Sequence, residues 1–151
     1  MFGWGRQRIR SAACYLRDGK LYLHSSSLAA AGFWTATPPW LVVDPADVEG
    51  LSRAIDAALA GSRARVRTPD RDTPVLAPLY ELAGVKSWSR FVAGTRSVTI
   101  EQAGAVRTFT PMRNAGARGG FEGLPELALE GRADEASGPA LRRALELARA
   151  D

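Results

Sequence analysis

The two side-chain types that most readily act in acid–base or nucleophilic chemistry at neutral pH, histidine and cysteine, occur once each, as His24 and Cys14. The serines at 25–27 follow His24 and could receive a proton, but no neighbouring residue would orient the imidazole. The alternation of the predicted strand indicates that His24 points outward beside Tyr22, as a surface aromatic. Cys14 has an apolar counterpart, Val98, in the second half of the chain, which indicates a small core residue.

The sequence contains none of the motifs that bind nucleotides, activate a serine or hold zinc. One histidine cannot form a two-histidine metal site, and one cysteine cannot form an internal disulfide. We therefore predict a protein that is not an enzyme and that holds neither a metal nor a cofactor.

Positive charge is the main indication of a ligand, since the chain has a net charge of +4 and a pI of about 9.8. The segment 113–120 combines Arg113 and Arg118 with glycines, whose backbone N–H groups could approach a phosphate. Acidic residues are interspersed with the bases, however, and a glycine loop before a strand needs no ligand. A basic nucleic-acid-binding module is thus the alternative function, although we do not expect contact with nucleic acid.

Five side chains are candidates for contact with another protein. Trp34 lies in a predicted irregular loop and has no aromatic counterpart in the other half of the chain. Tryptophans of this kind are favoured interface anchors. Asp70 and Asp72 lie in a polar linker, and Glu122 and Glu126 bracket a glycine–phenylalanine loop, so we predict that these carboxylates are exposed and able to meet a basic partner.

The composition is that of one compact domain. A chain of 151 residues with 46% hydrophobic residues would bury roughly two-thirds of its unfolded surface. No apolar run is long enough for a signal peptide or a membrane-spanning helix. We predict a single domain over residues 1–151, a cytoplasmic location and no contact with a membrane. Nothing in the sequence predicts the oligomeric state.

One structural plan occurs twice along the chain. In each half a tryptophan, Trp4 or Trp88, precedes two short apolar runs, a Gly-Phe pair and a helix. We predict two tandem copies, 1–61 and 84–151, joined by a connector at 62–83 and related by an approximate two-fold axis. Trp4 and Trp88 would then be equivalent anchors of the core.

The first copy is predicted to begin with strands at 12–17 and 20–26 around an Asp18-Gly19 hairpin turn. A third short strand at 40–43 precedes a helix that ends at Gly61. Asp44 followed by a proline predicts the N-cap of this helix.

The second copy repeats this pattern, with a third strand at 127–129 and a helix capped by Asp134 or Ser137. Short helices are predicted at 74–83, in the connector, and at 86–92, at the start of the second copy. The predicted fold is α+β: an antiparallel sheet of about six strands with helices on one face, built from two ββ-loop-βα copies.

Several short segments together resemble one protein family. They are MFGWG at 1–5, SSL at 26–28, AGF at 31–33, PD at 69–70, LAGVKSW at 82–88, GFE at 120–122 and LP at 124–125. In this combination the chain resembles the immunity proteins of bacterial contact-dependent growth inhibition, in particular those set against toxins of the ribonuclease A type.

The resemblance implies a non-catalytic protein that binds a toxin domain delivered by a neighbouring cell and covers its active site. A ribonuclease site is lined by cations, so an inhibitor commonly meets it with carboxylates and aromatic side chains. The net charge of +4 departs from this expectation. It requires either that the carboxylates gather on one face or that the partner is not a basic nuclease.

Overall fold

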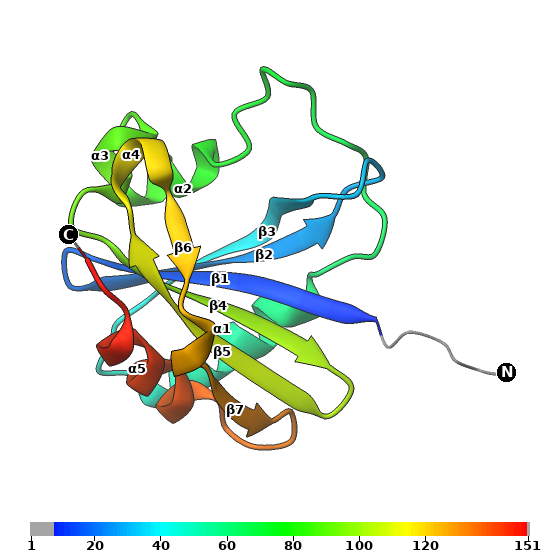
Figure 1. Cartoon of the computed structure of the whole chain (residues 1–151), viewed down its shortest axis with the longest axis vertical. Coiled ribbons are helices and arrows are strands. Elements are labelled where there is room, and N and C mark those ends of the chain that lie inside the picture. The colour runs from blue at the N-terminus through cyan, green and yellow to red at the C-terminus, as the bar shows by residue number, and fades with distance from the viewer. Residues whose placement is uncertain (1–7, 151) are drawn as a thin grey trace, which may run out of the picture.

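The computed structural model describes residues 8–150, which form seven strands, five helices and one 3-10 turn (Figure 1). The strands are β1 (Ile9–Arg17), β2 (Lys20–Leu28), β3 (Trp34–Val43), β4 (Arg96–Ala103), β5 (Val106–Asn114), β6 (Phe121–Gly123) and β7 (Leu129–Arg132). The helices are α1 (Val48–Ala60), α2 (Ala77–Ala83), α3 (Trp88–Val92), α4 (Gly116–Gly119) and α5 (Gly138–Leu147), and the 3-10 turn is η1 (Pro125–Leu127).

All of these strands belong to one antiparallel sheet in the order β3-β2-β1-β4-β5-β6, with β7 also paired to β5. β6 and β7 share the outer edge of β5, where β6 pairs with residues 112–114 and β7 with residues 106–109. β3 is therefore at one edge of the sheet, and β6 and β7 are at the other. The prediction of an α+β fold with an antiparallel sheet is confirmed.

The two halves of the chain meet at the centre of the sheet, where β1 pairs with β4 and Cys14 lies opposite Val98. β2 and β3 follow on one side, and β5, β6 and β7 on the other. This order is compatible with two tandem copies, and the two-fold relationship itself stays a prediction. Trp4 lies outside the described residues, so its equivalence with Trp88 stays a prediction as well.

The turn between β1 and β2 has the geometry that its sequence predicts. Asp18 and Gly19 have φ values of 51° and 73°, which are the two left-handed conformations of a type I′ turn. The twist of this turn matches that of the two strands it joins, and Arg17 pairs with Lys20 directly before and after it.

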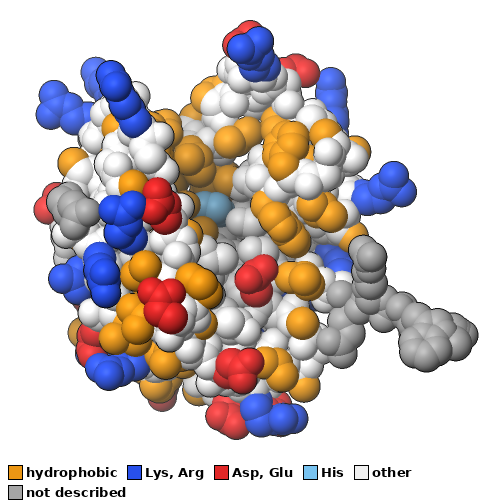
Figure 2. All heavy atoms as spheres, viewed as in Figure 1, with side chains coloured by type: hydrophobic (Ala, Val, Ile, Leu, Met, Phe, Trp, Pro, Cys, Tyr) orange, Lys and Arg blue, Asp and Glu red, His pale blue; other side chains and the backbone are white. Residues whose placement is uncertain are grey.

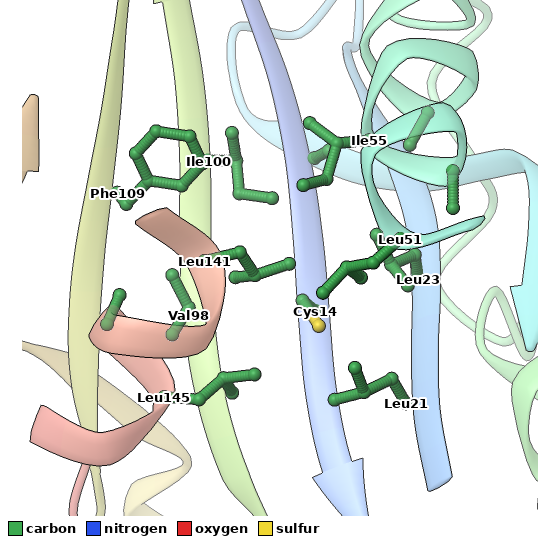
Figure 3. Packing of buried hydrophobic residues seen from close by; sticks show 14 of the residues in the cluster. Cys14, Leu21, Leu23, Leu51, Ile55, Val98, Ile100, Phe109, Leu141 and Leu145 are labelled. Atoms are coloured by element: carbon green, nitrogen blue, oxygen red, sulfur yellow. The ribbon is translucent and has the colours of Figure 1, made fainter. Parts of the chain in front are cut away.

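The larger hydrophobic core lies between the sheet and the two long helices, α1 and α5 (Figure 3). Residues of the strands that alternate toward this face meet the apolar stripe of each helix. The labelled strand residues are Cys14, Leu21, Leu23, Val98, Ile100 and Phe109, and the labelled helix residues are Leu51, Ile55, Leu141 and Leu145. Cys14 is fully buried here, and burial raises the pKa of its thiol, so it is the predicted core residue.

A second, aromatic cluster lies on the opposite face of the sheet. Tyr15 and Tyr22, which alternate with the core residues of β1 and β2, pack with Leu79 of α2 and Phe91 of α3. The rings of Tyr15 and Phe91 meet edge to face at 5.2 Å between centroids. The prediction had the helices on one face of the sheet. The long helices α1 and α5 share one face, whereas the short helices α2 and α3 cover part of the other.

Two predicted boundaries are wrong by two or three residues. The N-cap of α1 is Asp47, whose side chain accepts a hydrogen bond from the Gly50 N–H at 2.9 Å. Asp44 instead accepts from Ala46 in the preceding turn. In the second copy the 3-10 turn η1, which begins at a proline, occupies the start of the predicted strand at 127–129, so β7 begins only at Leu129.

β3 is longer than predicted because the pairing continues on both sides of a bulge. His24 lies opposite Trp40, whereas the next residue, Ser25, lies opposite Thr37. Pro38 and Pro39 fall between these two pairs. A proline has no N–H to donate, and an edge strand with a bulge tolerates it. Trp34, predicted in a loop, is thus the first residue of a strand.

Candidate functional site

A cleft of about 480 Å³ opens on the sheet face that α1 and α5 leave uncovered. Its floor is formed by Ala13 and Tyr15 of β1 and by His24 and Ser26 of β2. Residues 33–36, at the start of β3, form one side. The loop between α1 and α2 (residues 61–76), called the α1–α2 loop below, forms another side with Pro69, Asp70, Arg71, Thr73, Val75 and Leu76. Figure 2 shows this cleft as a hollow with hydrophobic side chains around it and the only histidine at its bottom.

Backbone hydrogen bonds hold the α1–α2 loop beside the β2–β3 hairpin. The Val66 N–H donates to the Leu28 carbonyl at 3.0 Å, and the Ala30 N–H donates to the Val66 carbonyl at 2.9 Å. The Ala31 N–H donates to the Thr68 hydroxyl at 2.9 Å. These contacts explain how residues 69–76, which belong to no helix or strand before α2, come to line the cleft.

His24 is buried, with 3% of its surface exposed, so the prediction of a surface aromatic is wrong. The sequence correctly predicted that His24 points to the face of the sheet opposite the helical core. It did not reveal that other side chains cover this face around His24. Nδ1 of His24 lies 2.7 Å from the Ser25 carbonyl, which can only accept, so Nδ1 carries the hydrogen. Nε2 is then the acceptor for the Tyr15 hydroxyl at 3.2 Å. The Trp40 ring lies 5.2 Å away, between centroids.

The environment of the floor favours neutral side chains. Burial lowers the pKa of His24 below its ordinary value of 6.5, and the hydrogen bond to the Ser25 carbonyl opposes this shift in part. Burial raises the pKa of Tyr15, with smaller contributions from Cys14 and Tyr80. At neutral pH the floor therefore consists of an uncharged imidazole and an uncharged phenol.

Two of the predicted contact residues, Trp34 and Asp70, line the cleft from different segments. Trp34 is 42% exposed and Phe33 beside it is 47% exposed, so the rim is aromatic and accessible. Asp70 and Arg71 are exposed and lie on the α1–α2 loop. Asp72 is exposed as predicted, but its side chain is not part of the lining.

Glu122 and Glu126 lie at the other edge of the sheet, on β6 and η1. Both are exposed as predicted. Glu122 forms an ion pair with Arg113 at 2.5 Å. The structure thus separates them from Trp34 and Asp70, and this ion pair joins the glycine-rich segment 113–120 to β6.

Sequence reasoning missed two carboxylates, Glu101 and Glu130, that the sheet places on the same face as the cleft. They belong to one cross-strand row, which we call the carboxylate row: Ala36, Ser26, Ser11, Glu101, Thr108 and Glu130. Neighbouring members lie about 5 Å apart, and the row begins at two residues that line the cleft. Within residues 8–150, neither glutamate takes part in an ion pair.

The row was hidden because its two glutamates lie far apart in the sequence and meet only through β5. The signal that could have found them is the alternation of β4 and β7, which directs Glu101 and Glu130 away from the helical core. In Figure 2 several acidic side chains lie toward the middle of this face, and most basic side chains lie around its rim.

No group of histidine, cysteine and carboxylate side chains within the described part of the chain is arranged to hold a metal ion. Residues 8–150 also include no helix that is both long and apolar enough to cross a membrane.

The fold is shared with two solved structures. One is a protein of unknown function from Neisseria meningitidis, with a TM-score of 0.78 and 18% identity, over 98% of this chain and 100% of that chain. The other is a chain of the CdiA-CT/CdiI toxin and immunity complex from Yersinia pseudotuberculosis, with a TM-score of 0.74 and 17% identity, over 94% of this chain and 98% of that chain. No family model and no curated protein matches this sequence.

Proposed function

We propose that this protein is an immunity protein that binds and neutralises the toxin of a contact-dependent growth inhibition system. The observation that carries the proposal is the fold shared with a chain of a toxin and immunity complex, over nearly the whole length of both chains. Of the two components of such a complex, the immunity protein is the one that the sequence segments at 1–5, 82–88 and 120–122 resemble.

The cleft and the carboxylate row supply a surface suited to this role. Trp34 and Phe33 form an exposed aromatic rim, and large aromatic side chains beside a concavity are the usual anchors of protein interfaces. Glu101 and Glu130, which form no ion pair with any residue between 8 and 150, extend the surface across the sheet. A partner that covers the cleft and the row would bury area on six adjacent strands, which fits an interface of about 800 Å² on each side.

The distribution of charge supports a basic partner despite the net charge of +4. The carboxylates of Glu101, Glu130 and Asp70 lie on or beside the open face, where Arg71 is the one arginine or lysine among the described residues that lines the cleft. The helices of the opposite face, α1 and α5, carry three bases and three carboxylates between them. A toxin whose active site holds phosphate with cations would be attracted more strongly to the open face than to the other. We therefore infer a ribonuclease toxin, inhibited in the cytoplasm by coverage of its active site.

The test is co-expression with the toxin domain encoded immediately upstream. We expect that cells survive only when both proteins are made, that the two elute together in size exclusion chromatography, and that RNA cleavage by the toxin stops at an equimolar ratio. A toxin domain from an unrelated system is the control for specificity. Cell death in the presence of this protein, together with separate elution, would contradict the proposal.

A further inference from the structure

The floor of the cleft contains one group, His24, that can gain a positive charge as the pH falls, and its hydrogen bonds are complete only in the neutral form. The His24 Nδ1–H donates to the Ser25 carbonyl, and Nε2 accepts from the Tyr15 hydroxyl. Trp40 packs against the imidazole from the paired strand. With both ring nitrogens satisfied inside the protein, the floor offers no positive charge to an incoming group.

Protonation of His24 would disturb this arrangement in two ways. Nε2 would become a donor pointing at the Tyr15 oxygen, so the Tyr15 hydroxyl hydrogen would lose its acceptor in a buried site. The floor would also gain a positive charge that is nearly out of contact with water. An apolar or cationic partner group seated above it would lose affinity.

The other charged or titratable groups around His24 do not replace it in this role. Tyr15 on β1 stays protonated because burial raises its pKa, and Tyr80 of α2 lies farther along the same aromatic cluster. Asp70 and Arg71 of the α1–α2 loop share the cleft but carry opposite charges. β3 contributes only indoles and small side chains to this site.

We propose that His24 determines what the cleft accepts: while the imidazole is neutral the cleft binds an apolar or cationic group of the toxin, and when it is protonated the cleft rejects that group. This inference rests on the proposed function. Binding and protonation are linked thermodynamically. A toxin that binds the neutral form of His24 more tightly must therefore lower the pKa of His24 in the complex.

The experiment measures toxin binding and the titration of His24 together. The dissociation constant is determined between about pH 7.5 and pH 5.5, a range in which histidine is the side chain that ordinarily titrates. Because His24 is the only histidine, its ring signals in NMR spectra of labelled protein are unambiguous, both free and bound to unlabelled toxin. We expect affinity to fall on acidification by at most about tenfold per pH unit, the limit for one proton, and the His24 pKa to be lower in the complex.

His24→Gln is the matched variant, since its side chain retains a donor and an acceptor but does not titrate. Any pH dependence that remains with this variant belongs to the toxin, and we expect it to be smaller than with the wild type. If the variant does not fold, the comparison of the His24 pKa in the free and bound wild-type protein still tests the inference. Binding with the same His24 pKa in the free and bound states would overturn the inference alone, whereas no binding at any pH would overturn the proposed function with it.

Discussion

Trp34 and Asp70 line the same cleft, although one begins an edge strand and the other lies in the long loop between α1 and α2. The hydrogen bonds between Ala30 and Val66 and between Ala31 and Thr68 bring the two segments together. The candidate binding surface therefore forms only because these hydrogen bonds hold the α1–α2 loop beside the β2–β3 hairpin.

Replacement of Trp34 by alanine should weaken toxin binding by about 2 kcal/mol or more, because the indole is an exposed aromatic at the rim of a concavity. Val42→Ala is the control: it lies on the same strand with a similar exposed fraction, 44%, but outside the cleft. Calorimetric titration of both variants with the toxin domain checks this. Equal losses for the two variants would contradict the assignment of the cleft.

Neutralisation of the carboxylate row should slow association with a basic toxin. We expect Glu101→Gln combined with Glu130→Gln to lower the association rate several-fold at low salt, and the difference to shrink as salt is added. Glu146→Gln combined with Glu135→Gln changes the net charge equally, and Glu146 lies on α5, on the other face. Stopped-flow or surface-based kinetics at several salt concentrations separates the two pairs. If the control variant with Glu135→Gln and Glu146→Gln slows association equally, the effect comes from net charge and not from the carboxylate row.

Tyr15→Phe should act on His24 as well as on stability. The variant removes the hydroxyl that donates to Nε2 and leaves a buried acceptor without a partner, at a cost of about 1–3 kcal/mol in the free energy of unfolding. Loss of a hydrogen bond to the neutral imidazole should also raise the pKa of His24. Urea denaturation and NMR titration measure the two effects, and an unchanged histidine titration would be evidence against the assigned tautomer.

The stability of the protein should depend on pH through His24. The pKa of His24 is lowered in the folded protein, so the unfolded chain binds a proton more readily. The free energy of unfolding should accordingly be independent of this group above about pH 6.5, and should decrease as the pH falls below it, by at most about 1.4 kcal/mol per unit. Urea denaturation of wild type and His24→Gln between about pH 5.5 and pH 8 tests this, and parallel curves would contradict it.

Asp56→Ala should be more destabilising than removal of an exposed carboxylate. Asp56 accepts a hydrogen bond at 2.8 Å from Arg107, whose side chain is only 7% exposed and also bonds Ser137 at the start of α5. Loss of Asp56 removes one hydrogen-bond partner from the buried guanidinium of Arg107. We expect the free energy of unfolding to fall by about 1–3 kcal/mol. Asp134→Ala removes an exposed pair with Arg132 and should cost less than about 1 kcal/mol. Thermal and urea denaturation compare the two.

The sequence predicted those features that depend on local geometry. The Asp18-Gly19 turn requires two left-handed residues, and the apolar alternation of β1 and β2 directs Cys14 and Leu23 into the core. The sequence predicted the ends of helices and strands less accurately. Asp44 and Asp47 are both acceptable caps four residues before apolar positions, and the choice between them depends on where the chain leaves β3.

Only the tertiary structure decided which surfaces are covered and which residues meet. Alternation predicted the face of the sheet on which His24 lies. Its burial comes from Tyr15 on β1 and Trp40 on β3, which contact its ring, in a cleft that the α1–α2 loop also lines. No local sequence pattern indicates a contact that comes from a distant segment. Glu101 and Glu130 likewise share a row only because β5 lies between their strands. Short-range sequence determines the strands and turns, since these depend on neighbouring residues, while the site depends on long-range pairing, which the sequence by itself leaves open.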